Sequence, residues 1–270
     1  MTIVVVGIAA DGWSGLPEQA RAEITACDVL LGGRRQLDLV PDGGYRKVAW
    51  PSPLLPALDE LITAHKGGRI GVLASGDPLL AGIGSTLVRR FGAERVRILP
   101  SVSSVALARA RMGWSAEDTD VVRTTGADTH PVLRTAGEGR RLLVLSADAD
   151  TPPAVAQLLT RHGFGESELT VWENLGTADE RRLDGTAHDW PHPPGAALNV
   201  LAVACRGPQP LPLTPGLPDD VFDHDGQLTK STVRATVLAA LAPRPGELLW
   251  DVGAGSGSVA VEWARLHPAN

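Results

Sequence analysis

The sequence feature that most constrains the fold of this chain is a buried strand followed by a small-residue turn and then a helix. Residues 69–74 form an apolar run, residues 75–78 read Ser-Gly-Asp-Pro, and a helix is predicted over 83–91. This order places backbone N–H groups and the Asp77 carboxylate at the carboxyl end of a strand, where open α/β folds bind ligands. Gly-Asp-Pro is also common turn chemistry, so the turn alone predicts only a βα connection.

The same alternation of strand and helix recurs through the first part of the chain. Strands are predicted over 3–7, 29–32, 46–50 and 96–99, and helices over 18–27, 54–65 and about 103–112. Continuous β-branched runs are typical of parallel strands that are buried on both faces. Ser103 or Ser104 is expected to cap the helix that follows residue 102, and the same helix end could also face a ligand.

A second α/β half follows a hinge-like stretch at 113–118. The pattern predicts strands over 121–123, 141–146, 169–174, 181–183 and 199–204, with a helix over 153–162. The last three strands have no long helix between them, so that part of the sheet should be largely antiparallel. We therefore expect two α/β lobes, about 1–112 and 113–206, with a cleft between them that holds a small ligand.

The composition excludes some partners and favours one compartment. A net charge of -6 argues against a protein that grips a nucleic-acid backbone. Cys27 and Cys205 lie far apart and lack the spacing of a metal site, which indicates a reducing compartment. With no secretory or membrane-spanning pattern in view, we expect a cytoplasmic protein that binds no metal, membrane or nucleic acid.

A different module is predicted after a proline-rich linker at 207–222. It contains a helix over 231–241, a strand over 247–252, a Gly-rich turn at 253–257 and a helix over 258–266. Glycines in such a turn let the backbone approach a nucleotide-like ligand, and the helix end supplies N–H donors. Asp251, just before the first glycine, favours S-adenosylmethionine over a dinucleotide, because that cofactor carries an ammonium and no pyrophosphate.

The second module is expected to be incomplete. In folds of this kind the acidic residue that holds the ribose lies about 20 residues beyond the glycines, and Asn270 comes before that point. One strand and two helices bury too little surface for an independent core. Residues 223–270 are thus predicted to be the start of a Rossmann-like methyltransferase domain.

Five stretches together resemble the tetrapyrrole methylase family. Three of them, at 5–13, 73–80 and 100–104, are similar to that family as a whole. Trp-Glu-Asn-Leu-Gly at 172–176 and Leu-Asn-Val-Leu-Ala at 198–202 narrow the resemblance to its bifunctional precorrin-6B (precorrin-6Y) C5,15-methyltransferases, which also decarboxylate their substrate. Residues 228–234 are similar to the second methylase of those enzymes.

The resemblance implies a fold, a reaction and a set of cofactor contacts. It implies a two-lobed fold and S-adenosylmethionine-dependent C-methylation in cobalamin biosynthesis, at carbon 5 by the first module and at carbon 15, with decarboxylation, by the second. Superfamily relatives are commonly dimers, so a homodimer or a higher homo-oligomer is expected. The cofactor contacts implied by motif match are Ala10, Gly76, Asp77, Leu80, Ser103, Ser104, Leu145, Thr229, Gly253, Ala254, Gly255, Ser256 and Gly257.

Some assignments concern the substrate and the reaction. Asp77 is expected to position the cofactor, and no acid–base pair is assigned. Arg34, Arg35 or Arg123 could receive carboxylates of the macrocycle. Ala9 stands where many relatives carry glycine, so a positive φ there would cost about 1 kcal/mol and disfavour tight contact.

Two other classes of function stay open. One is a methylase of the same fold that acts on another macrocycle carbon, on ribosomal RNA or on a modified histidine. The other is a protein that binds cofactor or macrocycle without catalysis.

Overall fold

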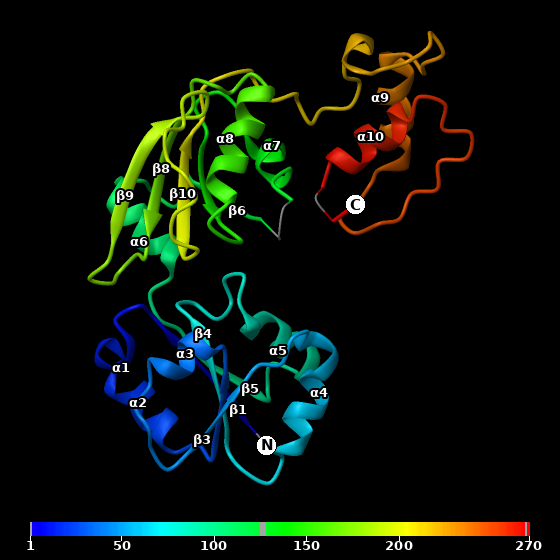
Figure 1. The fold of residues 1–270 in the computed structure, drawn as a ribbon. Helices are drawn as coiled ribbons and strands as arrows, with labels where there is room; N and C mark the ends of the chain where they lie inside the picture. Colours follow the sequence, from blue (N-terminus) through cyan, green and yellow to red (C-terminus); the bar gives the residue numbers. More distant parts are fainter. Residues whose placement is uncertain (1, 125–127, 268) are drawn as a thin grey trace. The chain divides into compact units, whose positions relative to one another are not determined.

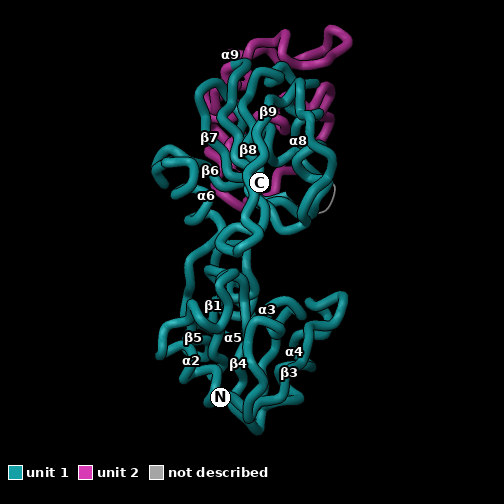
Figure 2. The backbone as a smooth tube through the Cα atoms, turned by 60° about the vertical axis from the view of Figure 1, so that its left-hand side comes forward, with its two compact units in different colours: residues 1–208 teal, residues 209–270 magenta. Residues whose placement is uncertain are grey.

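The computed structural model describes residues 2–124, 128–267 and 269–270. The chain divides into two compact units, Met1–Pro208 and Gln209–Asn270 (Figure 2). No helix within these described ranges is long and apolar enough to cross a membrane.

The first lobe is built on a parallel sheet with strand order β3-β2-β4-β1-β5. Its strands are β1 (Ile3–Ile8), β2 (Val29–Gly32), β3 (Arg46–Ala49), β4 (Ile70–Ser75) and β5 (Val96–Leu99). All six residues of β1 are buried, because helices cover both faces of the sheet. Parallel pairing brings the carboxyl ends of β1, β4 and β5 to one edge, where their turns meet.

Helices cover the two faces of this sheet (Figure 1). They are α1 (Gly12–Gly15), α2 (Glu18–Thr25), α3 (Arg34–Asp38), α4 (Leu54–Ala64) and α5 (Ile83–Phe91). Ile24 of α2 and Leu37 of α3 pack against Val4 and Val6 on one face. Helices α4 and α5 pack against the alternate strand residues on the other face. The longer helices α2, α4 and α5 were predicted from sequence; α1 and α3 were not.

The second lobe contains a mixed sheet with strand order β6-β7-β10-β8-β9. Its strands are β6 (Asp120–Arg123), β7 (Arg141–Leu145), β8 (Glu168–Glu173), β9 (Arg181–Thr186) and β10 (Asn199–Ala204). Among the described strands of this lobe only β6 and β7 pair in parallel, and β10 runs antiparallel to both β7 and β8. The predicted antiparallel character of this region is confirmed.

Helices also cover both faces of the second sheet. They are α6 (Ser104–Met112), α7 (Pro131–Thr135) and α8 (Thr151–Arg161). Helices α7 and α8 cover one face, and Val105 and Ala108 of α6 pack against Leu143 and Ala202 on the other. We expected α6 in the first lobe, but its apolar side is buried on the second sheet. The division between the lobes therefore precedes α6.

Each lobe has one cysteine in its core. Cys27 packs with α2 and β2 in the first lobe, and Cys205 lies beside β10 in the second. Burial raises the pKa of the Cys27 thiol from 9.0 to about 11, and it also raises the pKa of Cys205. Both thiols are thus protonated at neutral pH.

The second unit consists of a 3-10 turn η1 (Asp219–Val221) and helices α9 (Ser231–Leu241) and α10 (Ser258–Arg265). The strand predicted over 247–252 is wrong, because these residues have no strand pairing. Leu248, Trp250 and Val252 are 82%, 81% and 91% exposed. A strand forms only when a neighbouring strand satisfies its backbone hydrogen-bonding groups. No strand of the described second unit lies beside residues 247–252.

Candidate functional site

A cavity of about 490 Å³ lies in the first unit, with walls from both lobes. Each strand that lines the cavity does so with residues at one end of its sheet. The lining residues are Ile8, Ala9, Ala10, Arg35, Ser75, Gly76, Asp77, Leu80, Ala81, Val102, Ser103, Ser104, Leu107, Arg123, Thr124, Leu145, Ser146, Ala147, Trp172, Leu175, Leu198, Asn199 and Val200.

The peptide groups of Gly76 tie together three turns at the first-lobe wall. Gly76 N–H donates to the Ile8 carbonyl at 3.0 Å, and the Gly76 carbonyl accepts from Ser101 N–H at 3.1 Å. Gly76 has φ +51°, and a Cβ there would lie 2.9 Å from Ser103 Cα. A Cβ on Gly7 would overlap the Gly76 carbonyl oxygen. Only glycine fits at these two positions.

Asp77 and Ser103 stabilise the turns on either side of Gly76. Asp77 Oδ1 accepts from Leu79 N–H at 2.8 Å, which leaves Oδ2 without a donor among the described residues. Ser103 Oγ accepts from Ala106 N–H at 3.1 Å and is the N-cap of α6, as predicted. A half-buried carboxylate oxygen and the start of a helix therefore line one wall.

The cavity brings together seven residues that the sequence singled out as cofactor contacts. Those seven are Ala10, Gly76, Asp77, Leu80, Ser103, Ser104 and Leu145. Ala9 lines the cavity beside Ala10 and does not have a positive φ. The condition under which we expected a cost at Ala9, a positive φ, is not met, so alanine lines the cavity without that cost.

Two arginines from different lobes reach the same cavity. Arg35 of α3 and Arg123 of β6 both line it, whereas Arg34 does not. Arg35 Nη2 donates to Ser75 Oγ at 2.9 Å, which holds the guanidinium beside the end of β4. Partial burial lowers the pKa of Arg35. These two cations and the Asp77 carboxylate are the charged groups among the lining residues described above.

Sequence reasoning missed most of the second-lobe wall. Trp172, Leu175 and Asn199 lie in the two stretches that narrowed the family resemblance, yet we assigned them no contact. Thr124 and Ser146 carry hydroxyls at the ends of β6 and β7. The rule that directed attention to the carboxyl end of β4 would have found these hydroxyls had it been applied to the second sheet.

The second unit holds the other predicted cofactor contacts. Gly253, Gly255 and Gly257 have φ values of +76°, +55° and +70°, conformations that favour glycine. Gly257 is the N-cap of α10, and its N–H donates to the Ala254 carbonyl at 2.8 Å. Ser256 is half-buried. The predicted Gly-rich turn before a helix is present, although its preceding strand is not.

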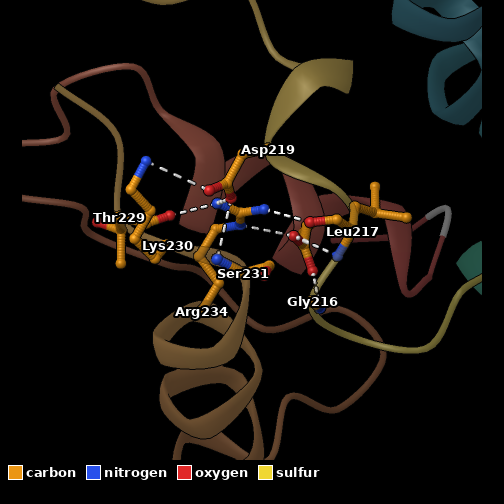
Figure 3. Close-up of polar contacts among 8 residues, drawn as sticks. Gly216, Leu217, Asp219, Thr229, Lys230, Ser231 and Arg234 are labelled. Atoms are coloured by element: carbon orange, nitrogen blue, oxygen red, sulfur yellow. Dashed lines mark hydrogen bonds and ion pairs between the residues drawn. The ribbon is translucent and has the colours of Figure 1, made fainter. Parts of the chain in front are cut away.

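Thr229 is held by a fully buried arginine of α9 (Figure 3). The Arg234 guanidinium donates to the Thr229 and Leu217 carbonyls, to Glu262 Oε1 at 2.8 Å and to Asp219 Oδ1 at 2.9 Å. Burial raises the pKa of Asp219, but hydrogen bonds from Arg234 and Lys230 outweigh burial and bring it below its usual value.

Glu262 of α10 completes this network. Its carboxylate also accepts from Gly216 N–H at 2.6 Å and from Leu217 N–H at 3.1 Å. One ion pair thus connects α9, α10, the end of the proline-rich segment and the backbone of Thr229.

Comparison with known sequence families gives two matches. Residues 2–190 match the Tetrapyrrole (Corrin/Porphyrin) Methylases. Residues 220–270 match a family described as a precorrin methyltransferase domain.

Individual relatives agree with these matches. A Mycobacterium tuberculosis precorrin-6Y C(5,15)-methyltransferase [decarboxylating] is 49% identical over 98% of this chain and 67% of its own length. A Salmonella typhimurium cobalt-precorrin-7 C(5)-methyltransferase is 31% identical over 66% of this chain and 88% of its own length.

A solved structure shares the fold of the first unit. It is a Thermus thermophilus uroporphyrin-III C-methyltransferase in complex with S-adenosylhomocysteine, with a TM-score of 0.57 and 21% identity. The match covers 76% of this chain and 92% of that one.

Proposed function

Because this chain belongs to the tetrapyrrole methylase family, we propose that its first unit is an S-adenosylmethionine-dependent C-methyltransferase of cobalamin biosynthesis. Its substrate is precorrin-6B, and the methyl group goes to carbon 5 of the macrocycle. The relative from M. tuberculosis carries a name for methylation at carbons 5 and 15 with decarboxylation. The Salmonella relative, which matches 66% of this chain over 88% of its own length, is named for carbon 5 alone.

The observation that carries this proposal is the assembly of one cavity from distant motifs. Residues near positions 10, 77, 103 and 145 line the same space of about 490 Å³. The close approach of three backbone turns at Gly76 brings Asp77, Ser103 and Ser104 together at the first-lobe wall. A cavity of this size with a few polar groups suits a small ligand.

The chemistry needs positioning more than acid–base catalysis. When bound, S-adenosylmethionine supplies an electrophilic methyl group on a sulfonium, and its leaving group is a neutral thioether. A carbon of the macrocycle with enamine character is already nucleophilic, so no proton needs to be removed before attack. Holding two partners in line contributes about 7–11 kcal/mol to lowering such a barrier.

The roles of individual residues follow from their places in the cavity. We assign Asp77, Ser103 and Ser104 to the orientation of the cofactor, with Asp77 Oδ2 as its acceptor. Arg35 and Arg123 are assigned to carboxylates of the macrocycle, because both residues line the cavity and no described acid forms a salt bridge with either. Guanidinium groups match carboxylates in geometry and charge.

Residues 209–270 belong, in this proposal, to a second methylase that acts at carbon 15 and decarboxylates the ring. The sequence match at 220–270 and the Gly-rich turn before α10 support this role. Thr229 and residues 253–257 are its proposed cofactor contacts. The chain spans 67% of the length of the M. tuberculosis relative, so this activity is proposed for the whole enzyme.

Two further properties belong to the same proposal. We propose that the protein works in the cytoplasm, which fits two unpaired, protonated thiols. We also propose that it forms a homodimer that needs no membrane or nucleic acid, in line with its net charge of -6.

Mass spectrometry of precorrin-6B incubated with S-adenosylmethionine and this chain tests the proposal. We expect the macrocycle to gain one methyl group and to keep its carboxyl groups. A folded protein that binds S-adenosylhomocysteine and precorrin-6B but leaves the macrocycle unchanged would point to a carrier and contradict the proposed activity.

A further inference from the structure

An ion pair in the second lobe connects α6 with the turn at 174–180, which joins β8 to β9. Arg111 lies in the last turn of α6, and Glu180 directly precedes β9. Arg111 Nε donates to Glu180 Oε1 at 2.6 Å, and its Nη2 donates to Glu180 Oε2 at 3.1 Å. Two parallel bonds between a guanidinium and a carboxylate fix the direction of both groups as well as their distance.

The same carboxylate holds the backbone of the turn. Glu180 Oε2 also accepts from Gly176 N–H at 2.8 Å. Thr177 N–H and Thr177 Oγ1 both donate to the Asn174 carbonyl, at 3.0 and 2.9 Å. Hydrogen bonds from Arg111 and Gly176 hold the pKa of the Glu180 carboxyl below its usual value, so it is charged at neutral pH. The turn is therefore closed by its own groups, and Glu180 ties it to α6.

The turn held in this way carries part of the cavity wall. Leu175 is 5% exposed and lines the cavity. Gly176 follows it, and a Cβ there would lie 3.2 Å from Leu107 Cδ1 and 3.6 Å from Ala10 Cβ. Leu107 belongs to α6, Ala10 follows β1 of the first lobe, and both line the cavity. The backbone of the turn thus lies where the two lobes meet.

Arg111 and Glu180 are not themselves among the residues of the described chain that line the cavity. An exposed ion pair usually contributes little to stability. Here only 18% of the Glu180 side chain is exposed, and its two oxygens accept three hydrogen bonds from α6 and from the turn. Such an arrangement fixes where the turn lies relative to α6.

We infer that Arg111 and Glu180 are positioning residues for methyl transfer, an inference that rests on the proposed function. They hold the turn at 174–180 beside Ala10 and so determine where Leu175 meets the ligand. S-adenosylmethionine is the ligand concerned, because Ala10 is one of its proposed contacts. Both residues act on it through the backbone of the turn.

Glu180→Ala removes both ties of the turn and tests this role. We expect the affinity for S-adenosylhomocysteine to fall about three- to ten-fold. The kcat for precorrin-6B should fall about ten- to a hundred-fold, because a misplacement of about 1 Å disturbs in-line transfer that strongly. Glu180→Gln should recover part of both losses, since its one oxygen can replace Oε2, which accepts from Arg111 and from Gly176. Calorimetry and steady-state kinetics give the two readouts.

Arg111→Met removes the other half of the pair. If the two residues act as a unit, Arg111→Met combined with Glu180→Ala should lose no more affinity than Glu180→Ala alone, and additive losses would contradict a single positioning unit. Glu168→Ala is the matched control. Arg206 Nη2 donates to Glu168 Oε1 at 2.8 Å, and this ion pair lies at the end of β8 and β10 far from the cavity. That control should leave affinity and kcat unchanged.

Calorimetry also separates positioning from folding. The stoichiometry of binding counts the folded molecules, whereas the dissociation constant reports the geometry of those that bind. If Glu180→Ala keeps the wild-type dissociation constant and kcat per binding site, with or without a lower stoichiometry or unfolding temperature, the inference is overturned while methylation by the wild type stands. A wild type that leaves precorrin-6B unchanged overturns the proposed function, whatever the variants do.

Discussion

At the scale of single residues, Gly7 and Gly76 determine how closely the turns of the cavity wall can approach one another. Their missing side chains let the turns after β1, β4 and β5 touch through backbone atoms. Any larger residue at Gly7 would push the Gly76 carbonyl away. The geometry of the first-lobe wall therefore depends on backbone contacts between turns, which the two glycines permit.

Asp77 combines a role in the turn with a proposed role toward the cofactor, and two substitutions separate them. Asp77→Asn keeps an oxygen for Leu79 N–H but removes the charge, whereas Asp77→Ala removes both. We expect both variants to bind S-adenosylhomocysteine about ten-fold or more weakly, as for the loss of a hydrogen bond to a charged group. Calorimetry measures this loss.

Thermal unfolding is the control for the Asp77 variants. Asp77→Asn should unfold near the wild-type temperature because the turn is retained, and Asp77→Ala should unfold lower. Unchanged affinity and turnover in both variants would show that Asp77 has no role in orienting the cofactor.

Arg35 and Arg34 are neighbours on α3 that differ in their access to the cavity, so they form a matched pair. Arg35→Gln should raise the KM for the macrocycle about three- to thirty-fold, because one charge-assisted contact to a carboxylate is lost. Arg34→Gln should leave KM unchanged. Steady-state kinetics with equal effects of both variants would argue against a carboxylate contact at Arg35.

The sequence predicted the first-lobe side of the site better than the second-lobe side, for a physical reason. Gly76, Asp77 and Ser103 belong to turns whose chemistry is local, so residue type and order reveal them. Leu145 and Val200 become neighbours in the cavity wall only through the register of β7 and β10, which are more than 50 residues apart in the chain. Short-range patterns do not specify that register.

At the scale of elements, most strands and long helices could be predicted because each buries a periodic apolar face. The segment 247–252 shows where that reasoning fails. Its apolar residues, Leu248 to Trp250 and Val252, predict a strand, yet Leu248 and Trp250 are exposed, and no strand pairs with this segment within the described residues. An apolar pattern shows that a segment can form a strand, but the strand forms only where another strand pairs with it.

The packing of α6 could not be predicted from its own sequence. Alanine alternates with arginine over residues 108–111, so the C-terminal half of this helix has no clearly apolar face. Val105 and Ala108 become buried only because the second sheet lies against them. Helix α6 thus belongs to the second lobe while its N-terminus, with Ser103 and Ser104, lines the cavity beside Gly76.

The ion pair between α9 and α10 is expected to hold the second unit together. Arg234→Met leaves Glu262, 3% exposed, without its buried cation. Breaking a buried pair on one side costs about 3–5 kcal/mol. Amide hydrogen exchange should therefore accelerate in α9 and α10 but not in α8.

A double variant and a control sharpen that experiment. Arg234→Met combined with Glu262→Gln leaves no unpaired charge and should recover part of the protection. Arg265→Met in α10 removes only a hydrogen bond to the Leu211 carbonyl and should cost less than about 1.5 kcal/mol. Equal exchange in wild type and Arg234→Met would contradict a structural role for the pair.

At the scale of the whole molecule, the first unit joins two lobes of different construction around one cavity. The first sheet is parallel and contributes residues of the turns after its strands, whereas the second sheet is mixed and contributes residues at its strand ends, such as Leu145 and Trp172. The residues proposed to bind ligand come from both. Any motion that separates the lobes would therefore dismantle the cavity without unfolding either sheet.

The single cysteine in each lobe provides a direct way to observe such independence. Mass-resolved alkylation should modify Cys27 only when the first core opens and Cys205 only when the second does. Because the folded pKa of Cys27 is raised from 9.0 to about 11, its stabilising contribution is complete below about pH 9 and declines above it. We expect alkylation to be slow at neutral pH and to accelerate as the solution becomes alkaline.

If the two thiols are modified at different rates in mild denaturant, the two lobes open independently. A bound cosubstrate that contacts both lobes should slow both modification reactions. Equal rates without ligand would mean that the halves unfold as a single cooperative block. The alkylation rates of Cys27 and Cys205, which have no proposed role in catalysis, would thus measure how tightly the two lobes close around the reactants.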